Sequence, residues 1–196
     1  MQVAIIKYNA GNTKSVENAL HRLGMQPVIT DIQEEILSAD KVIFPGVGHA
    51  ETTMQHLKEK RLDALIRNLK QPVLGICLGQ QLMCAHSEEG NIDCLNIFPV
   101  MVKKFQASDK TDKIPQIGWN NLEYLKSPLF KDIDSSSFVY FVHSYYCELS
   151  DYTIATCDYI LPFSAALHRD NFYATQFHPE KSASVGNRII ENFINI

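Results

Sequence analysis

The stretch 72–83 restricts the fold of this chain more than any other part of its sequence. It starts with a short apolar run, 72–76, and passes without a linker into an amphipathic stretch with helical spacing. Cys77 stands at the junction, with Gly75 and Gly79 two residues to either side. A nucleophile flanked by glycines in this way is typical of a strand that bends sharply into a helix. The stretch therefore predicts an α/β protein with a reactive group at the end of a strand.

The rest of the first half repeats the alternation of strand and helix. Strands are predicted at 2–8, 25–30 and 41–44, and helices near 16–23, 50–60 and 62–68. Gly24 stands where a left-handed glycine commonly ends a helix. Strands that alternate with helices favour a mainly parallel sheet between helical layers, with sites at the carboxyl ends of its strands.

The second half contains more strands and fewer helices. Strand candidates lie at 101–105, 137–142, 153–157, 165–169 and 172–177, and a final helix is predicted from about 185 to 194. Short turns such as 169–171 favour antiparallel additions to the sheet. No stretch is long and flexible enough to be a domain linker, so we expect one domain over residues 1–196.

Composition excludes several classes of protein. Of the 196 residues, 45% are hydrophobic and 20% are charged, and no apolar run approaches the roughly 20 residues that cross a bilayer. The net charge of −4, with scattered Lys and Arg, argues against a nucleic-acid binder. No secretory signal is visible, so we expect a cytoplasmic location. The five cysteines form no C-x-x-C pair, which argues against a disulfide framework or a zinc site. We expect neither metal nor cofactor.

Cys77 is the candidate nucleophile. At a strand-to-helix bend its thiol would lie at the N-terminus of a helix, where the dipole and free N–H groups favour the thiolate. The N–H of Leu78 would then be placed to bind an oxyanion. The alternative is a small buried core residue, as free cysteines often are. We assign the other four cysteines to that structural role.

His178 is the candidate base, because a thiol nucleophile needs an imidazole and a group that orients it. It follows a predicted strand, and Pro179 ends that strand. Positions two apart point to the same side of extended backbone, which would let Glu180 reach His178. For the other histidines outside the 143–146 stretch we keep a surface or core role: His21, His49, His56, His86 and His168.

Both motifs resemble those of the class I, or triad, glutamine amidotransferases. The matching stretches are 75–81, Gly-Ile-Cys-Leu-Gly-Gln-Gln, and 177–180, Phe-His-Pro-Glu. With 8–12, 45–48, 117–120 and 143–146, they make the chain most similar to the glutaminase subunits of imidazole glycerol phosphate synthase. The resemblance runs nearly from end to end. It implies a three-layer, flavodoxin-like domain with a mainly parallel central sheet and antiparallel additions in the C-terminal half.

The resemblance implies a glutaminase mechanism. Cys77 would attack the side-chain amide of L-glutamine and form a thioester. His178 would act as base and then as acid, and Glu180 would orient it. The oxyanion would be bound by Leu78 and, after a peptide rearrangement triggered by a partner, by a second donor that Gly46 and Val47 supply. The residues implied to contact glutamine are Gln81, His143, Ser144 and Tyr145.

The resemblance also implies a partner, a (βα)8-barrel cyclase subunit that uses the ammonia to form imidazole glycerol phosphate in histidine biosynthesis. The residues implied to face it in a heterodimer are Asn12, Trp119, Asn120 and Lys181. A core position is the alternative for Trp119. Lys7 and Asn9 depart from the acidic residue and the glycine usual in the family. Because both are expected near the docking face, they bear on the identity of the partner and not on glutamine hydrolysis.

Three other functions fit parts of this pattern. The same glutaminase could serve a paralogous synthase, for example one that amidates a sugar. A stand-alone cysteine hydrolase could act on γ-glutamyl bonds without any partner. A docking module without activity is the third, and it has no use for an intact set of Cys77, His178 and Glu180.

Overall fold

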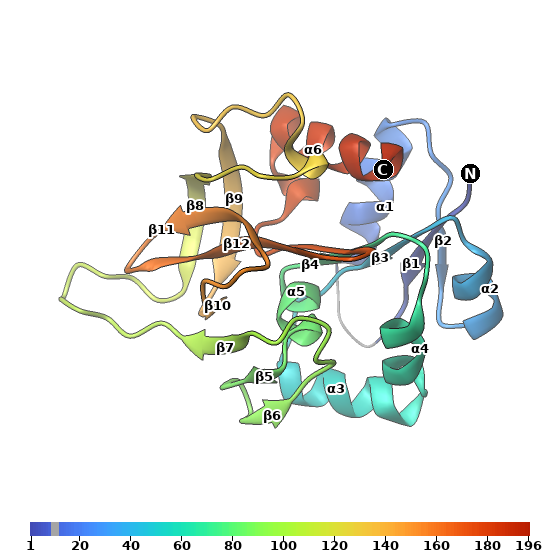
Figure 1. Cartoon of the computed structure of the whole chain (residues 1–196), viewed down its shortest axis with the longest axis horizontal. Helices are drawn as coiled ribbons and strands as arrows, with labels where there is room; N and C mark the ends of the chain where they lie inside the picture. Colours follow the sequence, from blue (N-terminus) through green and yellow to red (C-terminus); the bar gives the residue numbers. More distant parts are fainter. Residues whose placement is uncertain (9–11) are drawn as a thin grey trace.

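A central sheet passes through the middle of the molecule (Figure 1). The computed structural model describes residues 1–8 and 12–196. Within them this sheet has seven strands in the order β11-β12-β13-β4-β3-β1-β2. In that order the strands are Thr153–Asp158, Pro162–Arg169, Phe172–Thr175, Val73–Ile76, Lys41–Phe44, Val3–Ile6 and Val28–Thr30. From β13 to β2 every neighbouring pair is parallel, and β12 and β11 are added antiparallel.

Helices cover both faces of this sheet (Figure 1). One face packs against α1 (Thr13–Arg22) and α6 (Ala183–Asn195). The other packs against α2 (Gln33–Ser38), α3 (Ala50–Glu59), α4 (Leu62–Asn68) and α5 (Leu78–Met83). In β1 alternate residues enter the two cores, which explains why the parallel strands are apolar throughout.

Two smaller sheets lie beside the central one (Figure 1). In the described residues, one has the order β10-β7-β5-β6, formed by Tyr145–Cys147, Met101–Lys104, His86–Ser87 and Ile92–Asp93. The other is an antiparallel pair of β8 (Gln116–Asn121) and β9 (Phe138–His143). The described part of the chain also has two 3-10 helices, η1 (Pro128–Phe130) and η2 (Pro179–Lys181).

The sequence predicted the three-layer architecture and the strand and helix types, and both are confirmed. The predicted strands at 101–105 and 137–142 were expected to extend the central sheet, and this was wrong, because they build the two smaller sheets. Their burial shows why: β9 alternates between buried and more exposed residues, and β7 buries Val102 alone, whereas a strand inside the central sheet is covered on both faces. Helix α2 was missed, since it is short and mostly polar and buries one side chain, Ile36.

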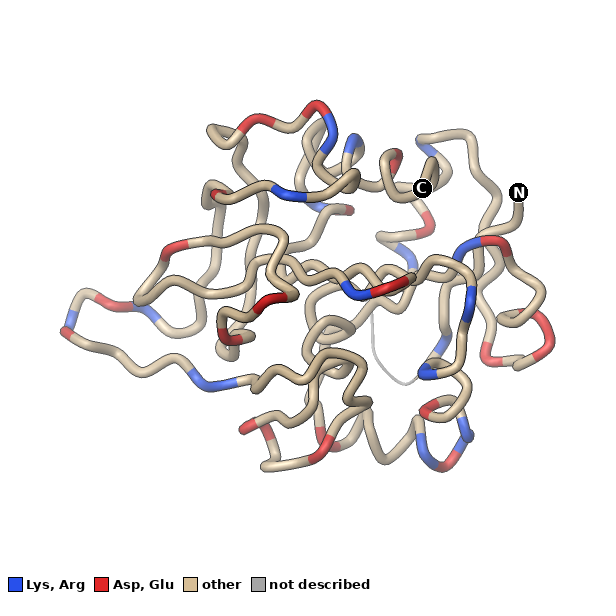
Figure 2. Tube along the Cα trace, viewed as in Figure 1, with Lys and Arg blue, Asp and Glu red and all other residues tan. Residues whose placement is uncertain are grey.

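The distribution of charged residues and the apolar character of the helices agree with the expectations from composition. Figure 2 shows Lys and Arg interleaved with Asp and Glu along the trace. Among the helices that the structure describes, none combines the length and the apolar character needed to span a bilayer.

Helix α6 packs closely on η2, the turn that follows His178. A Cβ atom built on Gly186 of α6 would overlap the carbonyl oxygen of Pro179 and come within 2.8 Å of the Cβ of Ser182. The glycine therefore lets the last helix approach the turn that carries Glu180. In this way the C-terminal helix sets the position of residues that the site needs.

We expect Gly186→Ala to lower the free energy of unfolding by about 1–3 kcal/mol through overpacking. The change would otherwise be favourable, because alanine has the higher helix propensity. Urea denaturation of the variant and of Ser184→Ala, an exposed position in the same helix, provides the measurement. A Gly186→Ala protein as stable as the Ser184→Ala control would contradict the packing argument.

Candidate active site

Cys77 lies at the junction of β4 and α5, as the sequence predicted. Its backbone has φ 53° and ψ −106°, a conformation that residues with a side chain rarely adopt and that costs on the order of 1–3 kcal/mol. The neighbouring strand holds it there, because the Cys77 N–H donates to the carbonyl of Thr175 at 2.7 Å. The strained bend directs the thiol away from the sheet.

The two flanking glycines are required by space. A Cβ on Gly79 would overlap the carbonyl oxygen of Phe44, at the end of the next strand. A Cβ on Gly75 would come within 2.9 Å of the sulfur of Met83 and 3.0 Å of the carbonyl carbon of Gly79. The absence of a Cβ at both positions therefore leaves room for the bend.

His178 and Glu180 form a buried pair. His178 Nδ1 lies 2.7 Å from Glu180 Oε1. The predicted route to this contact was wrong: the backbone after His178 is not extended but turns into η2, which begins at Pro179. The backbone N–H of His178 donates to the carbonyl of Tyr140 at 2.9 Å, and its carbonyl accepts from the Ser182 hydroxyl at 2.7 Å. Strand β9 and the start of α6 thus fix the imidazole.

The thiol of Cys77 neighbours this imidazole and controls its charge. Burial lowers the pKa of His178, but the nearby Cys77 sulfur and the contact with Glu180 raise it to about 10. Among the described residues Nε2 of His178 has no conventional hydrogen-bond partner. An imidazole with a raised pKa beside a cysteine is the arrangement expected of an activated nucleophile.

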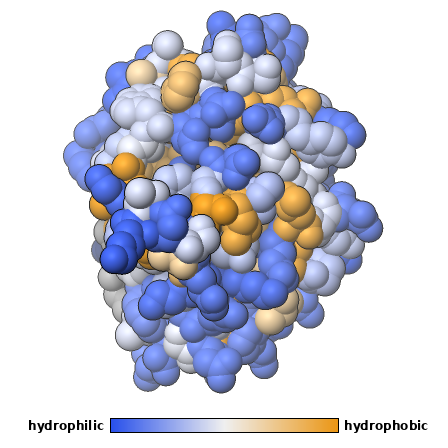
Figure 3. All heavy atoms as spheres, turned by 90° about the vertical axis from the view of Figure 1, so that its left-hand side faces the viewer, coloured by the Kyte–Doolittle hydropathy of each residue, from blue (hydrophilic) through white to orange (hydrophobic). Residues whose placement is uncertain are grey.

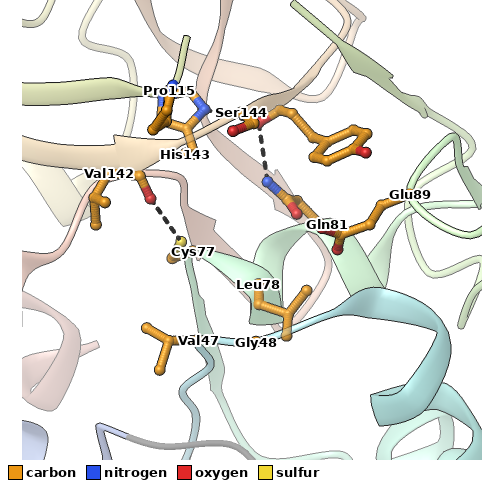
Figure 4. A pocket seen from close by; sticks show the side chains of 11 residues that line it. Val47, Gly48, Cys77, Leu78, Gln81, Glu89, Pro115, Val142, His143 and Ser144 are labelled. Atoms are coloured by element: carbon orange, nitrogen blue, oxygen red, sulfur yellow. Dashed lines mark hydrogen bonds between the residues drawn. The ribbon is translucent and has the colours of Figure 1, made fainter.

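A pocket of about 300 Å³ opens beside Cys77 (Figure 4). Its lining combines the nucleophile bend, the loop after β3 and the end of β9. The lining residues are Val47, Gly48, Cys77, Leu78, Gln81, Glu89, Pro115, Val142, His143, Ser144 and Tyr145. All four residues that the resemblance implied to contact glutamine are therefore brought to one cavity.

Hydrogen bonds fix two of these side chains. The amide nitrogen of Gln81 donates to the carbonyl of Tyr145 and to Gln176 Oε1, each at 3.0 Å. His143 Nδ1 lies 2.7 Å from the Tyr145 carbonyl. Burial lowers the pKa of His143 to about 4, so its ring is neutral at neutral pH. Uncharged side chains therefore fix the backbone of residues 143–145.

The loop after β3 holds the expected oxyanion donor in a blocked state. The N–H of Leu78 donates to the carbonyl of Gly46 at 3.3 Å. The carbonyl of Pro45 accepts from the buried hydroxyl of Tyr8. A carbonyl group, rather than a second N–H, therefore faces Leu78.

Three site residues had no motif that could have revealed them. Glu89 lines the pocket, and its Oε2 accepts from the N–H of Ala50 at 2.7 Å. The carbonyl of Val142 lies 3.8 Å from the Cys77 sulfur, and the side-chain nitrogen of Gln176 lies 3.7 Å from it. In the described part of the chain no three or more His, Cys, Asp or Glu side chains gather as a metal site would need.

The residues implied to face a partner occupy different settings. Trp119 is 53% exposed on β8, so the core alternative is wrong. Lys181 is exposed on η2, and Asn120 donates to the carbonyl of Asp158 at 2.9 Å. Asn12 is half-buried, and its amide donates to Glu180 Oε1. Lys7 is exposed just after β1; Asn9 lies outside the described residues.

Comparison with known proteins agrees with the geometry. The family "Glutamine amidotransferase class-I" matches residues 4–196. The imidazole glycerol phosphate synthase subunit HisH of Bacteroides fragilis is 62% identical over 196 residues, which is 100% of both chains. The HisH subunit of Bacteroides thetaiotaomicron is 60% identical, again over 100% of both chains.

A solved structure shares the fold. A putative GMP synthase subunit from Thermoplasma acidophilum superposes with a TM-score of 0.76 at 23% identity, over 100% of this chain and 93% of that one. At that identity the likeness concerns the fold alone. The match over residues 4–196 and the relatives above 60% identity show that this chain belongs to the class I glutamine amidotransferase family, within its imidazole glycerol phosphate synthase subunit HisH group.

Proposed function

We propose that Cys77, His178 and Glu180 are the groups with which this glutamine amidotransferase hydrolyses L-glutamine to glutamate and ammonia. The observation that carries the proposal is the meeting of three features at one point. A strained cysteine stands at a strand-to-helix bend, a buried histidine neighbours it, and a carboxylate orients that histidine at 2.7 Å.

The chemistry follows from these positions. The Cys77 sulfur attacks the side-chain amide carbon, and the carbonyl oxygen takes up the negative charge. Protonated His178 gives its proton to the nitrogen as the C–N bond breaks, which releases ammonia and leaves a thioester. Neutral His178 then takes a proton from water, whose oxygen displaces the sulfur and yields glutamate. Holding thiolate and carbonyl in line contributes roughly 7–11 kcal/mol toward the barrier.

The pocket supports an amino-acid substrate. Glu89 is the acidic residue among those that line it, and its carboxylate suits the α-ammonium group of glutamine. Gln81 and the backbone of residues 143–145 lie on the same wall as Glu89, across from Val47 (Figure 4). We assign this wall to the recognition of the substrate's amino-acid end, which leaves its side-chain amide directed at Cys77.

We further propose that the blocked oxyanion site is a resting state. A flip of the 46–47 peptide would turn the Gly46 carbonyl away from the N–H of Leu78 and bring the N–H of Val47 into the site. Gly46 lacks a Cβ and permits such a rotation. One oxyanion donor is worth about 2.7–4 kcal/mol. Binding of the partner subunit would favour the flipped state.

The partner proposed is a (βα)8-barrel cyclase subunit in a cytoplasmic heterodimer. One face of the β8–β9 pair supports a docking surface here: Ile117 is 63% exposed, Trp119 53% and Phe138 54%. Figure 3 shows apolar atoms gathered on the side of the molecule where β8 and β9 lie. Val142 pairs with Ile117 and lines the pocket. The docking surface therefore adjoins the site where ammonia is released, which suits direct transfer before ammonia becomes ammonium.

Cys77→Ala is expected to abolish glutaminase activity while the complex with the barrel subunit still forms. The nucleophile is removed, but the interface is untouched. Glutamate release and co-purification are the two measurements. Cys94→Ala, a buried cysteine away from the pocket, is the matched control and should keep its activity. Retained glutamine hydrolysis in Cys77→Ala would contradict the assignment of the nucleophile.

The pKa of His178 should fall clearly below about 10 in Cys77→Ala, because burial is then opposed by Glu180 alone. Because the pKa of His178 is raised, protonation of its ring stabilises the folded protein. This contribution is complete below pH 6.5 and is lost as the pH rises through about 10. NMR titration of the labelled ring measures both proteins. An unchanged pKa would show that the thiol does not hold the proton on His178.

The barrel subunit should raise the glutaminase rate by about 10²–10³ if it exposes one further oxyanion donor. Val47→Pro removes the N–H of that residue and should lose most of this acceleration, whereas Val47→Ala should keep it. Initial rates with and without the subunit provide the measurement. Equal rates for the free and bound chain would refute the resting-state proposal.

A further inference from the structure

Asn12 departs from the usual behaviour of asparagine at the start of a helix. It is the N-cap residue of α1, a place where its side chain normally accepts a hydrogen bond from the first turn. That bond stabilises the start of the helix. Here Asn12 makes no side-chain cap, and its backbone is left-handed, with φ 80° and ψ 0°. The start of α1 is therefore less stable than it would be if the Asn12 side chain capped it.

The side chain is used elsewhere. Asn12 Nδ2 donates to Glu180 Oε1, which is also the oxygen that His178 Nδ1 contacts at 2.7 Å. Asn12 and Glu180 are 168 positions apart in the chain. Glu180 is buried, and its other oxygen, Oε2, has no partner among the described residues. Asn12 and His178 thus provide the described side-chain hydrogen bonds that hold this carboxylate.

We propose that Asn12 is a positioning residue of the site, which fixes the rotamer of Glu180 and through it the orientation of His178. Asn12 forgoes the side-chain cap that would stabilise α1, and the buried carboxylate of Glu180 gains a hydrogen bond instead. Such exchanges are typical of functional sites. The inference rests on the proposed roles of Cys77, His178 and Glu180. Through Asn12, the N-terminus of α1 is also connected by a hydrogen bond to Glu180 of the triad.

Asn12→Ser separates positioning from stability. Serine is a good N-cap residue, but its short side chain does not reach Glu180. A hydrogen bond to a charged group is worth roughly 1.5–3 kcal/mol, so kcat should fall about 10- to 100-fold with little change in KM. The melting temperature should fall modestly, because serine is less favoured than asparagine at φ 80°, so kcat relative to the Asn96→Ser control is the deciding measurement. The assay uses the full chain in complex with the barrel subunit.

Two further variants complete the comparison. Asn96→Ser is the matched control, because Asn96 is exposed and has φ 52° but does not contact the triad; its kcat should be unchanged. Asn12→Asp keeps the size of the side chain and replaces the donor with a carboxylate facing Glu180. It should lower kcat at least as far as Asn12→Ser, and it tests the proposal if the serine variant folds poorly.

A double-variant cycle shows whether Asn12 acts through Glu180. In a Glu180→Gln background, adding Asn12→Ser should cost no further activity. An additive loss, or parental kcat in both Asn12 variants, would overturn the positioning role. Activity that survives in Cys77→Ala would instead overturn the proposed catalytic groups, so the two failures are distinguishable.

Discussion

The site depends on one strained bend. The parallel strands on both sides of β4 hold Cys77 at φ 53°. On one side the Cys77 N–H donates to Thr175, and on the other Gly79 packs against the end of β3. The bend raises the sulfur above the carboxyl edge of the sheet. Everything else in the site approaches that sulfur from other parts of the chain.

The imidazole reaches the bend through a second set of constraints. The turn η2 places Glu180 beside His178, and α6 packs on that turn through Gly186. Burial alone would lower the pKa of His178, but the neighbouring Cys77 and Glu180 reverse that shift and raise it. In the proposed mechanism, the proton donor of the first step is thus in place before the substrate arrives.

The expected oxyanion site at Leu78, in contrast, is blocked. The N–H of Leu78 donates to the carbonyl of Gly46. In the proposed mechanism, the nucleophile and the acid are therefore in place while the oxyanion donor is blocked. A glutaminase that supplies ammonia to a synthase benefits from this division, because glutamine is hydrolysed only when the product has an acceptor. The exposed apolar face of β8 and β9 beside the pocket suits such control by a partner.

The sequence alone determined the alternation of strands and helices, the bend at Cys77 and the pairing of His178 with Glu180, because each depends on residues close in the chain. Only the tertiary structure decided the rest. The strand pairing in the two smaller sheets, and the positions of Glu89 and of the Val142 carbonyl at the pocket, depend on contacts between segments far apart in the chain. Asn12 was expected at the partner surface, yet its amide turns to Glu180. Contacts between residues 168 positions apart follow from packing of the whole chain, and no local pattern encodes them.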